Sequence, residues 1–313
     1  MRIVSAAEVE AATPYPDLIE SLRAMFRQGC AMPVRHHHPV KVPGASDAML
    51  LLMPAWQDGQ AIGVKLVTVF PDNAQRDLPA IQGVYLLLDG RTGVPRALLD
   101  GPMLTKRRTA AASALAADYL ARRDAARLLV IGTGALAPEL VAAHAAIRPI
   151  REVRIWGRTP AKAAALAARV AAGGLAAAAT TALEESTAWA DVVSCATLSR
   201  EPLVLGARLR PGVHVDLVGA FTPDMRESDD EAARRAQVFV DTRAGATREA
   251  GDIVQPLRSG ILTEAKIRGD LYELCRGERR GREDDKAVTL FKSVGAALED
   301  LAAALLVVDR LPA

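Results

Sequence analysis

This sequence has few cysteines and few aromatic residues, and its positive and negative charges nearly balance. The three cysteines, Cys30, Cys195 and Cys275, lie far apart and show no metal-ligand spacing, so we expect reduced thiols and a cytoplasmic protein. Aromatic residues make up only 4% of the 313, whereas half are hydrophobic, so alanine, leucine and valine must build most of the core. A formal net charge of +2 gives no electrostatic reason to expect nucleic acid or an anionic membrane as partner.

Long apolar runs are absent as well. The N-terminus, Met1 to Leu18, interrupts its apolar residues with acidic residues and proline, so it lacks the apolar core of a signal peptide. The richest stretch, Ala163 to Ala182, is mostly alanine and is broken by Arg169 and Gly173-Gly174, which predicts a helix and a turn. We therefore expect no membrane segment, and the chain length favours two domains of a globular α/β protein.

The first third of the chain predicts an α+β domain. The spacing of apolar residues indicates one helix from Ala6 to Phe26. Strands are expected at Ala48–Pro54, Ala61–Val69 and Gln82–Leu88, separated by turn sequences, and a helix at Thr105–Ala121. Several strands in a row before a long helix favour this class over a parallel α/β domain.

From Arg127 onward, strands and helices alternate. Helices are expected at Pro138–Ala146 and Pro160–Ala172, and a final apolar helix at Leu290–Val308. The strands expected between them are Leu128–Ile131, Glu152–Trp156, Val192–Cys195, Val213–Leu217 and Val238–Val240. This alternation predicts βαβ units and a doubly wound parallel sheet of the Rossmann type.

A glycine-rich turn follows the first strand of this alternating region. The segment Gly132-Thr133-Gly134-Ala135-Leu136-Ala137 comes directly after four apolar strand residues and directly before a helix, as the dinucleotide fingerprint requires. Gly132 permits the tight turn, and Gly134 lets the backbone approach a pyrophosphate at the helix N-terminus. The alternative is a strand-to-helix turn without a ligand, but the surrounding pattern favours an NAD(P) site.

The end of the next strand distinguishes NADP from NAD. NAD sites usually place an acidic residue there for the ribose 2′-hydroxyl, whereas an arginine accommodates a 2′-phosphate. Here the strand ends in Trp156-Gly157-Arg158-Thr159, with Lys162 nearby and no carboxylate. We therefore expect NADP(H) as the favoured cofactor, and NAD(H) if Arg158 merely caps a solvated strand end.

Three basic residues precede the Rossmann region in unusual settings. Arg35 follows Met32-Pro33-Val34, Lys65 lies within an apolar strand, and Arg108 begins an alanine-rich helix. On pattern alone, a lysine flanked by valine and leucine is as often an outward-facing edge residue as a functional one. Three cations converging in one cleft would bind a carboxylate, with arginine preferred for bidentate contacts.

Segments in the same order along nearly the whole chain resemble the ornithine cyclodeaminase/μ-crystallin family. One departure is Leu136, where the family usually has glutamine. The matching segments are Val64-Lys65 through Phe70–Asn73, Leu104-Thr105 with Arg108–Ala111, Ile131–Gly134, Gly219–Glu227, and Thr289 through Phe291–Gly295 to Asp300. The resemblance implies a homodimer, with a substrate-binding/dimerisation domain made of residues 1–118 and 290–313 beside a Rossmann domain at residues 119–289.

The resemblance also implies roles for particular residues. Arg35, Lys65 and Arg108 would hold the substrate carboxylate beside the nicotinamide, and Ser293 and Gly295 would lie near the nicotinamide ring. The cofactor-binding set would be Gly132, Thr133, Gly134, Ala135, Leu136, Arg158, Thr159, Thr197, Ser293 and Gly295, where Thr197 follows small residues that let the cofactor pass.

The family contains several chemistries, and one position separates them. Ornithine cyclodeaminases, which convert ornithine to proline and ammonia with NAD, resemble one another in a catalytic aspartate shortly after a Gly-Gly pair. Phe221 stands there in this chain and cannot transfer a proton. The resemblance therefore favours the ketimine reductase branch, in which NADPH reduces a cyclic imino acid such as Δ1-pyrroline-2-carboxylate.

In that reaction each candidate residue has an expected role. Arg108, assisted by Arg35, would clamp the carboxylate, Lys65 would act electrostatically or donate a proton, and Phe221 would supply an apolar wall. The alternatives are ornithine cyclodeamination, reductive amination of the alanine-dehydrogenase kind, and a crystallin-like protein that binds NADPH or a small ligand without turnover.

Two further features receive no functional role. His36-His37-His38 invites a metal site, but adjacent histidines on a strand alternate faces and no acidic or cysteine cluster accompanies them, so no metal is expected. Glu249, Gly251 and Asp252 match a family stretch to which the sequence assigns no role.

Overall fold

The computed structural model describes residues 1–311, with Ala74 by its backbone alone, and the chain forms two compact units. The first unit consists of Met1–Arg108 with Ala297–Ala313, and the second of Thr109–Ala296. Helix α3 (Gly101–Leu120) continues from one unit into the other. Each unit has its own sheet and its own core.

The first unit is built on a six-stranded sheet in the order β1-β6-β5-β4-β3-β2. Strands β2 to β6 pair antiparallel, and β1 adds to the edge of β6 in parallel. The strands are β1 (Arg2–Val4), β2 (His36–Val40), β3 (Ala48–Gln57), β4 (Ala61–Val69), β5 (Ile81–Asp89) and β6 (Pro95–Asp100). The expected α+β class is therefore confirmed, while β1, β2 and β6 were not predicted.

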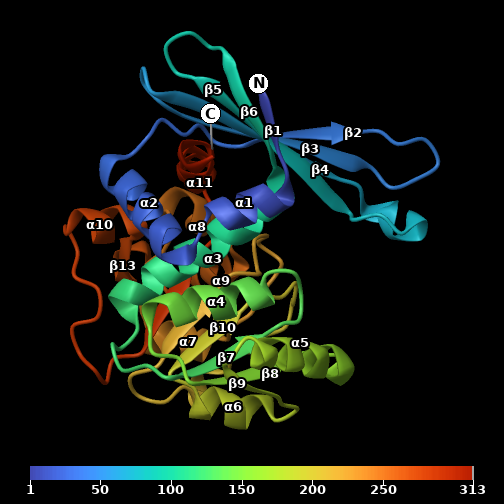
Figure 1. Ribbon diagram of the computed structural model, residues 1–313. Coiled ribbons are helices and arrows are strands. Elements are labelled where there is room, and N and C mark those ends of the chain that lie inside the picture. Colours follow the sequence, from blue (N-terminus) through green and yellow to red (C-terminus); the bar gives the residue numbers. More distant parts are fainter. Residues whose placement is uncertain (312–313) are drawn as a thin grey trace. The chain divides into compact units, whose positions relative to one another are not determined.

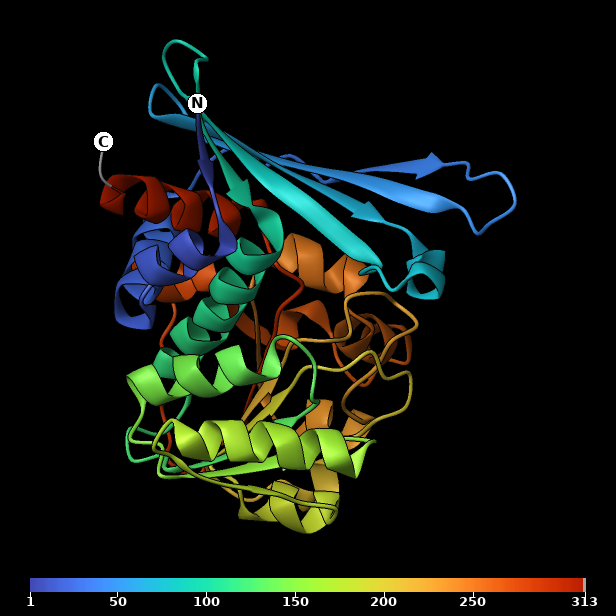
Figure 2. The same cartoon turned by 45° about the vertical axis from the view of Figure 1, so that its right-hand side comes forward.

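Helices α1 (Ala6–Ala12) and α2 (Tyr15–Gln28) replace the single helix expected from Ala6 to Phe26. The single-helix prediction is wrong because Pro14 cannot donate a backbone hydrogen bond to continue the first helix, and it takes an extended ψ of 139° before the second. Helix α11 (Ala297–Arg310) packs along α2, as Figure 2 shows for the red and blue helices.

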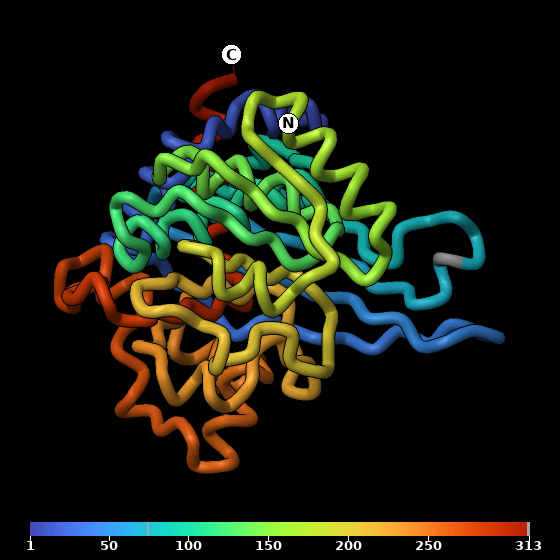
Figure 3. Tube along the Cα trace, turned by 90° about the horizontal axis from the view of Figure 1, so that it is seen from below, coloured from blue at the N-terminus to red at the C-terminus, as the bar shows by residue number. Residues whose placement is uncertain are grey.

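The two faces of the first sheet differ in burial. Helix α11 packs against β3, β4 and β5, and the residues on the covered face are buried. They include Met53, Ala55, Lys65, Tyr85 and Leu87. On the other face, apolar residues such as Leu52, Leu66, Val84 and Leu86 stay half-buried or exposed. At one end of the sheet (Figure 3), the loop after β2 is joined to the 3-10 helix η1 (Pro71–Arg76), since Asp72 accepts hydrogen bonds from Ser46 N and Oγ.

The second unit contains an eight-stranded sheet that is parallel throughout. Its order is β13-β12-β14-β11-β10-β7-β8-β9. The strands are β7 (Arg127–Ile131), β8 (Glu152–Trp156), β9 (Ala176–Ala179), β10 (Val192–Cys195), β11 (His214–Leu217), β12 (Gln237–Val240), β13 (Ile267–Asp270) and β14 (Thr289–Lys292). The predicted doubly wound Rossmann sheet is confirmed, with β9, β13 and β14 as strands that were not predicted.

Helices cover both faces of this sheet. The C-terminal half of α3, α4 (Ala137–Ile147) and α5 (Pro160–Ala172) enclose one apolar core, and Figures 1 and 2 show α4 and α5 lying next to each other. The other core lies under α6 (Leu183–Trp189), α7 (Asp230–Arg235), α8 (Arg243–Glu249) and α9 (Gly251–Arg258). The remaining short elements are η2 (Gly206–Arg208), η3 (Glu264–Lys266) and α10 (Leu271–Arg276).

The helix expected from Leu290 to Val308 is partly wrong. Thr289–Lys292 forms β14, which is inserted between β11 and β12, and the helix begins only at Ala297. The apolar run Leu290-Phe291 is compatible with a helix or a strand. It forms a strand because it completes the parallel ladder between the buried strands β11 and β12.

Candidate functional site

A pocket of about 370 Å³ opens in the second unit at the carboxyl ends of β7, β8, β10 and β11. Strand β7 pairs with β8 on one side and β10 on the other, so the chain reverses its winding direction here. Ligands of open α/β sheets bind at such a switch point. The lining residues are Gly132, Thr133, Gly134, Leu136, Trp156, Gly157, Arg158, Thr159, Lys162, Ala196, Thr197, Leu198, Ser199, Leu203, Val218, Gly219 and Phe221.

The two glycines of the predicted fingerprint occupy different environments. Gly132 has a φ of +122°, and a Cβ there would lie 2.6 Å from Ala196 O, so neither the conformation nor the space admits a side chain. A Cβ on Gly134 would meet nothing within 4 Å, because this residue faces open space in the pocket. Gly132 thus forms the turn, and Gly134 leaves room for a ligand beside the N-terminus of α4.

A basic edge of the pocket is formed at the end of β8. Arg158, Thr159 and Lys162 all line it and are exposed. Within the described chain, neither basic side chain forms an ion pair. Thr159 precedes α5 without capping it through its hydroxyl. Two cations and a hydroxyl at a helix N-terminus form a suitable site for a phosphate group.

The pocket therefore fits a dinucleotide on grounds of its own geometry. It has an open glycine, a helix N-terminus and a cationic edge, and these are the features that a pyrophosphate and a ribose phosphate require. Thr197 lines the pocket next to the glycine turn, where its Cγ2 would lie 3.5 Å from a Cβ on Gly132, and Phe221 lines it with 43% of its surface exposed.

Three predicted cofactor residues lie outside this lining. Ala135 is exposed within the glycine-rich turn. Ser293 and Gly295 are buried just after β14, where the carboxylate of Asp241 accepts hydrogen bonds from Val294 N at 2.6 Å and Gly295 N at 2.7 Å. Their nearness to a nicotinamide stays a prediction.

In the first unit, Lys65 and Arg108 meet on a pair of acidic residues of α11. Lys65 Nζ lies 2.7 Å from Asp300 Oδ2, and Arg108 Nε donates to Asp300 Oδ1 at 2.9 Å. Arg108 also donates through its NH1 nitrogen to Glu299 Oε2 at 2.5 Å. The alternative of an outward-facing lysine is excluded, because Lys65 is 3% exposed and Asp300 is fully buried.

Burial and neighbouring charge change the acid-base behaviour of this cluster. Burial, together with the charge of Arg108, lowers the pKa of Lys65 from 10.5 to about 8, although Asp300 opposes the shift. Half-buried Arg35 also lowers it, so this third predicted cation acts on the same site. Lys65 contacts Asp300 with one of three N–H donors, so donors remain for another anion or a nitrogen.

Tyr85 lies directly opposite Lys65 in the β4–β5 ladder. Its hydroxyl is buried without a hydrogen-bond partner among the described residues, and a Cβ on Gly63 would lie 1.9 Å from that oxygen. Burial and the nearby Asp300 raise the pKa of Tyr85 well above its usual value. Gly63 therefore provides the space that the tyrosine ring occupies beside the cluster.

Sequence reasoning missed the acidic half of this cluster. Glu299 and Asp300 are two charges between Leu298 and Leu301 in an otherwise apolar helix, and this position was the available signal that they had buried partners. Arg107, next to Arg108, has a different role, since its Nε donates to Thr13 Oγ1 and its guanidinium stacks 3.8 Å from the Tyr15 ring centroid.

The histidine run, which received no functional role from the sequence, forms no metal centre in the described chain. His36, His37 and His38 are exposed on β2, and the rings of His36 and His38 lie 6.2 Å apart. The described residues contain no group of three or more metal-ligating side chains. In the same part of the chain, no helix is long and apolar enough to cross a membrane. Burial raises the pKa of the Cys30 thiol to about 11.

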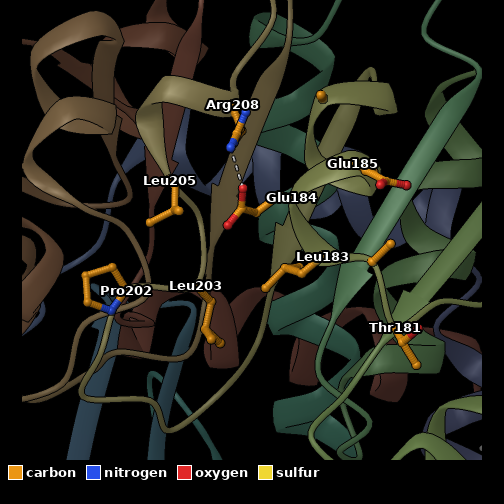
Figure 4. A pocket seen from close by; sticks show the side chains of 10 residues that line it. Thr181, Leu183, Glu184, Glu185, Pro202, Leu203, Leu205 and Arg208 are labelled. Atoms are coloured by element: carbon orange, nitrogen blue, oxygen red, sulfur yellow. Dashed lines mark ion pairs between the residues drawn. The ribbon is translucent and has the colours of Figure 1, made fainter.

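A second cavity of about 760 Å³ lies in the second unit beside α6 (Figure 4). Its wall is mostly apolar, with Leu183, Leu203 and Leu205, and the exposed pair Glu184–Arg208 spans 2.7 Å at its edge. Leu203 lines this cavity and the switch-point pocket alike, so the two are neighbours.

Comparison with known proteins agrees with this geometry. The sequence model of the ornithine cyclodeaminase/mu-crystallin family matches residues 1–313. A Delta(1)-pyrroline-2-carboxylate reductase of Paracoccus denitrificans is 40% identical over 91% of this chain and 89% of its own length. The Thermococcus litoralis Delta(1)-pyrroline-2-carboxylate reductase, solved with NADH and L-proline, has a TM-score of 0.91 and 33% identity, covering 99% of this chain and 97% of its own. An archaeal alanine dehydrogenase dimer with bound NAD has a TM-score of 0.90 and 28% identity, covering 99% and 95%.

Proposed function

This chain belongs to the ornithine cyclodeaminase/mu-crystallin family, and we propose that it is an NAD(P)-dependent reductase of cyclic imino acids such as Δ1-pyrroline-2-carboxylate. The observation that carries the proposal is the buried pair Lys65 and Arg108, supported on Asp300. An ammonium and a guanidinium held together by a shared carboxylate can bind the carboxylate of an amino or imino acid without rearranging. The reductase activity of the Paracoccus and Thermococcus relatives supports the same substrate class.

In this proposal Lys65 has a second role. Reduction of a C=N bond adds a hydride to carbon and leaves a nitrogen that must carry a proton. The bound NAD(P)H would supply the hydride, held by the turn Gly132–Ala137 and the edge residues Arg158 and Thr159. With a pKa of about 8, Lys65 exists in both protonation states near neutral pH and can stabilise or protonate the imine nitrogen.

Phe221 favours imine reduction over ornithine cyclodeamination. Deamination requires a base that removes protons from an amine and activates water, and a phenyl ring at the rim of the dinucleotide pocket can do neither. Reduction of a preformed imine needs no such base. An apolar side chain there would instead exclude water from the hydride-transfer site.

NADPH is the proposed donor. Arg158 and Lys162 place two positive charges at the end of β8, where an NAD site would carry an acidic residue. The Thermococcus structure contains NADH, so the preference for NADPH is proposed for this chain on its own residues. Fluorescence titration should give a lower Kd for NADPH than for NADH, and equal affinities would contradict the preference.

The central experiment is a substrate panel with purified protein. NADPH oxidation should be followed at 340 nm with Δ1-pyrroline-2-carboxylate, with its six-membered homologue, and with pyruvate plus ammonia. Turnover with the cyclic imines supports the proposal. Turnover with pyruvate and ammonia alone would identify the second candidate, reductive amination, which the similarity to the archaeal alanine dehydrogenase favours. Tight NADPH binding without any turnover would indicate a binding protein.

We further propose that the protein forms a homodimer through the open face of the first sheet. Leu66 and Val84 are paired across β4 and β5 and remain 38% and 37% exposed. A contiguous apolar sheet face is a common protein interface, and the alanine dehydrogenase relative is a dimer. Light scattering should give twice the chain mass of 33.2 kDa, and charged substitutions of both residues should yield a monomer.

A further inference from the structure

The loops of the dinucleotide pocket are connected from behind by one buried carboxylate. Glu227 is fully buried, and its Oε1 accepts hydrogen bonds from Thr197 N at 2.6 Å and Thr197 Oγ1 at 2.8 Å. Its Oε2 accepts from Gly219 N at 2.7 Å and Ala220 N at 3.4 Å. Thr197 and Gly219 both line the pocket, in the loops that follow β10 and β11.

The Glu227 carboxylate is itself fixed by a second layer of buried charge. Asp252, at the start of α9, accepts through Oδ1 from Glu227 N at 2.9 Å and from Ser228 N at 2.8 Å. Lys292 Nζ on β14 is fully buried, 3.8 Å from Glu227 Oε2 and 3.5 Å from Asp252 Oδ2. A buried carboxylate is costly to form, and here four N–H and O–H donors and one ammonium offset that cost.

The loops after β10 and β11 are in such close contact that no side chain fits between them at Gly219. A Cβ on Gly219 would lie 1.8 Å from Thr197 O and 2.6 Å from Glu227 Oε1. The main-chain carbonyl of Glu227 also accepts from Leu203 N at 2.9 Å, and Leu203 is another lining residue. Glu227 therefore contacts Thr197 and Leu203 in the loop after β10 and Gly219 in the loop after β11, without lining the pocket itself.

We propose that Glu227 is the positioning residue of the cofactor site, which sets dinucleotide affinity by holding the loops after β10 and β11 together. This role rests on the proposed function, since it requires that the switch-point pocket binds NAD(P)H. It also gives Asp252 a role that its sequence motif alone did not reveal. Burial raises the pKa of Glu227, and the ammonium of Lys292 opposes that shift and favours the ionised carboxylate, although Asp252 adds to the rise. The ionised form offers both oxygens as acceptors without placing an O–H against the N–H donors.

The chemistry of the carboxylate gives a specific test. Both oxygens of Glu227 face donors, so the amide of Glu227→Gln must turn its NH₂ group toward N–H groups of one loop whichever way it is rotated. We expect this isosteric change to raise the Kd for NADPH at least about tenfold. The KM of the imino acid at saturating NADPH should stay within about twofold, whereas a general loss of structure would leave the Kd of the folded fraction unchanged.

Asp252→Asn is the matched control for charge. Asp252 accepts hydrogen bonds from main-chain N–H groups through Oδ1 only. The side-chain oxygen of an asparagine can keep those bonds, while one negative charge beside Lys292 is removed. If loop positioning matters, Glu227→Gln should raise the NADPH Kd several times more than Asp252→Asn. Equal effects of the two variants would mean that charge alone is responsible and would overturn the proposal, as would a Glu227→Gln affinity within about twofold of the wild type.

A pair of glycine variants decides the question if Glu227→Gln does not fold. Gly219→Ala pushes the two loops apart, whereas Gly206→Ala creates a similar clash, 2.2 Å from Ala232 N, outside the pocket lining. Weaker NADPH binding in Gly219→Ala alone supports the proposal, and equal binding in both contradicts it. A wild-type protein that binds no dinucleotide would instead refute the proposed function. Failure of the imino acid assay with NADPH binding intact would refute the substrate while leaving this test in force.

Discussion

Asp300→Asn tests whether the cation cluster of the first unit depends on one buried carboxylate. Asp300 is fully buried and contacts Lys65 at 2.7 Å and Arg108 at 2.9 Å. The asparagine has almost the same shape but leaves two buried cations without their shared counter-ion. Removing one partner of a buried ion pair lowers the free energy of unfolding by about 3–5 kcal/mol, because the remaining charge is buried without compensation.

The chain offers a matched control for this substitution. Asp47 also lies 2.7 Å from a lysine ammonium, that of Lys41, but the two side chains are 51% and 86% exposed. Exposed pairs contribute about 0–1 kcal/mol, so Asp47→Asn should leave the free energy of unfolding nearly unchanged. Urea unfolding at pH 7, followed by circular dichroism, measures both variants against the wild type.

The pH dependence sharpens the test. In the wild type the ammonium of Lys65 loses its proton above about pH 8, and the attraction to Asp300 is lost with it. Because Asp300 raises the pKa of Lys65, the ammonium of the variant loses its proton at lower pH and so escapes the repulsion from Arg108 earlier. The difference between Asp300→Asn and the wild type should therefore shrink between pH 6 and pH 9. An Asp300→Asn variant that is no less stable than Asp47→Asn at pH 7, or whose loss of stability does not depend on pH, would refute the electrostatic account of this cluster.

Three further predictions concern single side chains. Because the pKa of Lys65 is lowered to about 8, its ammonium form predominates only below that pH, so kcat/KM for the imino acid should be constant at low pH and fall above about pH 8 in a pH–rate profile. Arg158→Ala should raise the KM for NADPH about 10- to 100-fold and leave that for NADH within about twofold, and a parallel rise for both would contradict 2′-phosphate binding. Tyr85→Phe removes a buried hydroxyl for which the described residues offer no hydrogen-bond partner, so thermal unfolding should show a Tm equal to or above that of the wild type. A fall in Tm would contradict this account of the hydroxyl.

The sequence alone determined the Rossmann half to a large extent. Strands β8 and β10, helix α5 and the glycine turn were predicted from local patterns, because buried parallel strands are continuous apolar runs and the fingerprint needs glycine at fixed positions. Arg158 could be assigned to the end of β8 from the sequence, because the strand before it was predicted from its own pattern. The position of β14 could not be predicted, since a four-residue apolar strand next to a helix carries no periodicity of its own.

Only the tertiary structure decided what the charged residues do. Val64 and Leu66 flank Lys65, so alternation could not say which face the lysine takes, and its counter-ion Asp300 lies at the far end of the chain. Glu227 and Lys292 likewise meet because β14 is inserted beside β11, a pairing that no local pattern encodes. Apolar periodicity specifies where strands and helices form, whereas burying a charge requires a partner, and that partner is chosen by the three-dimensional packing of distant segments.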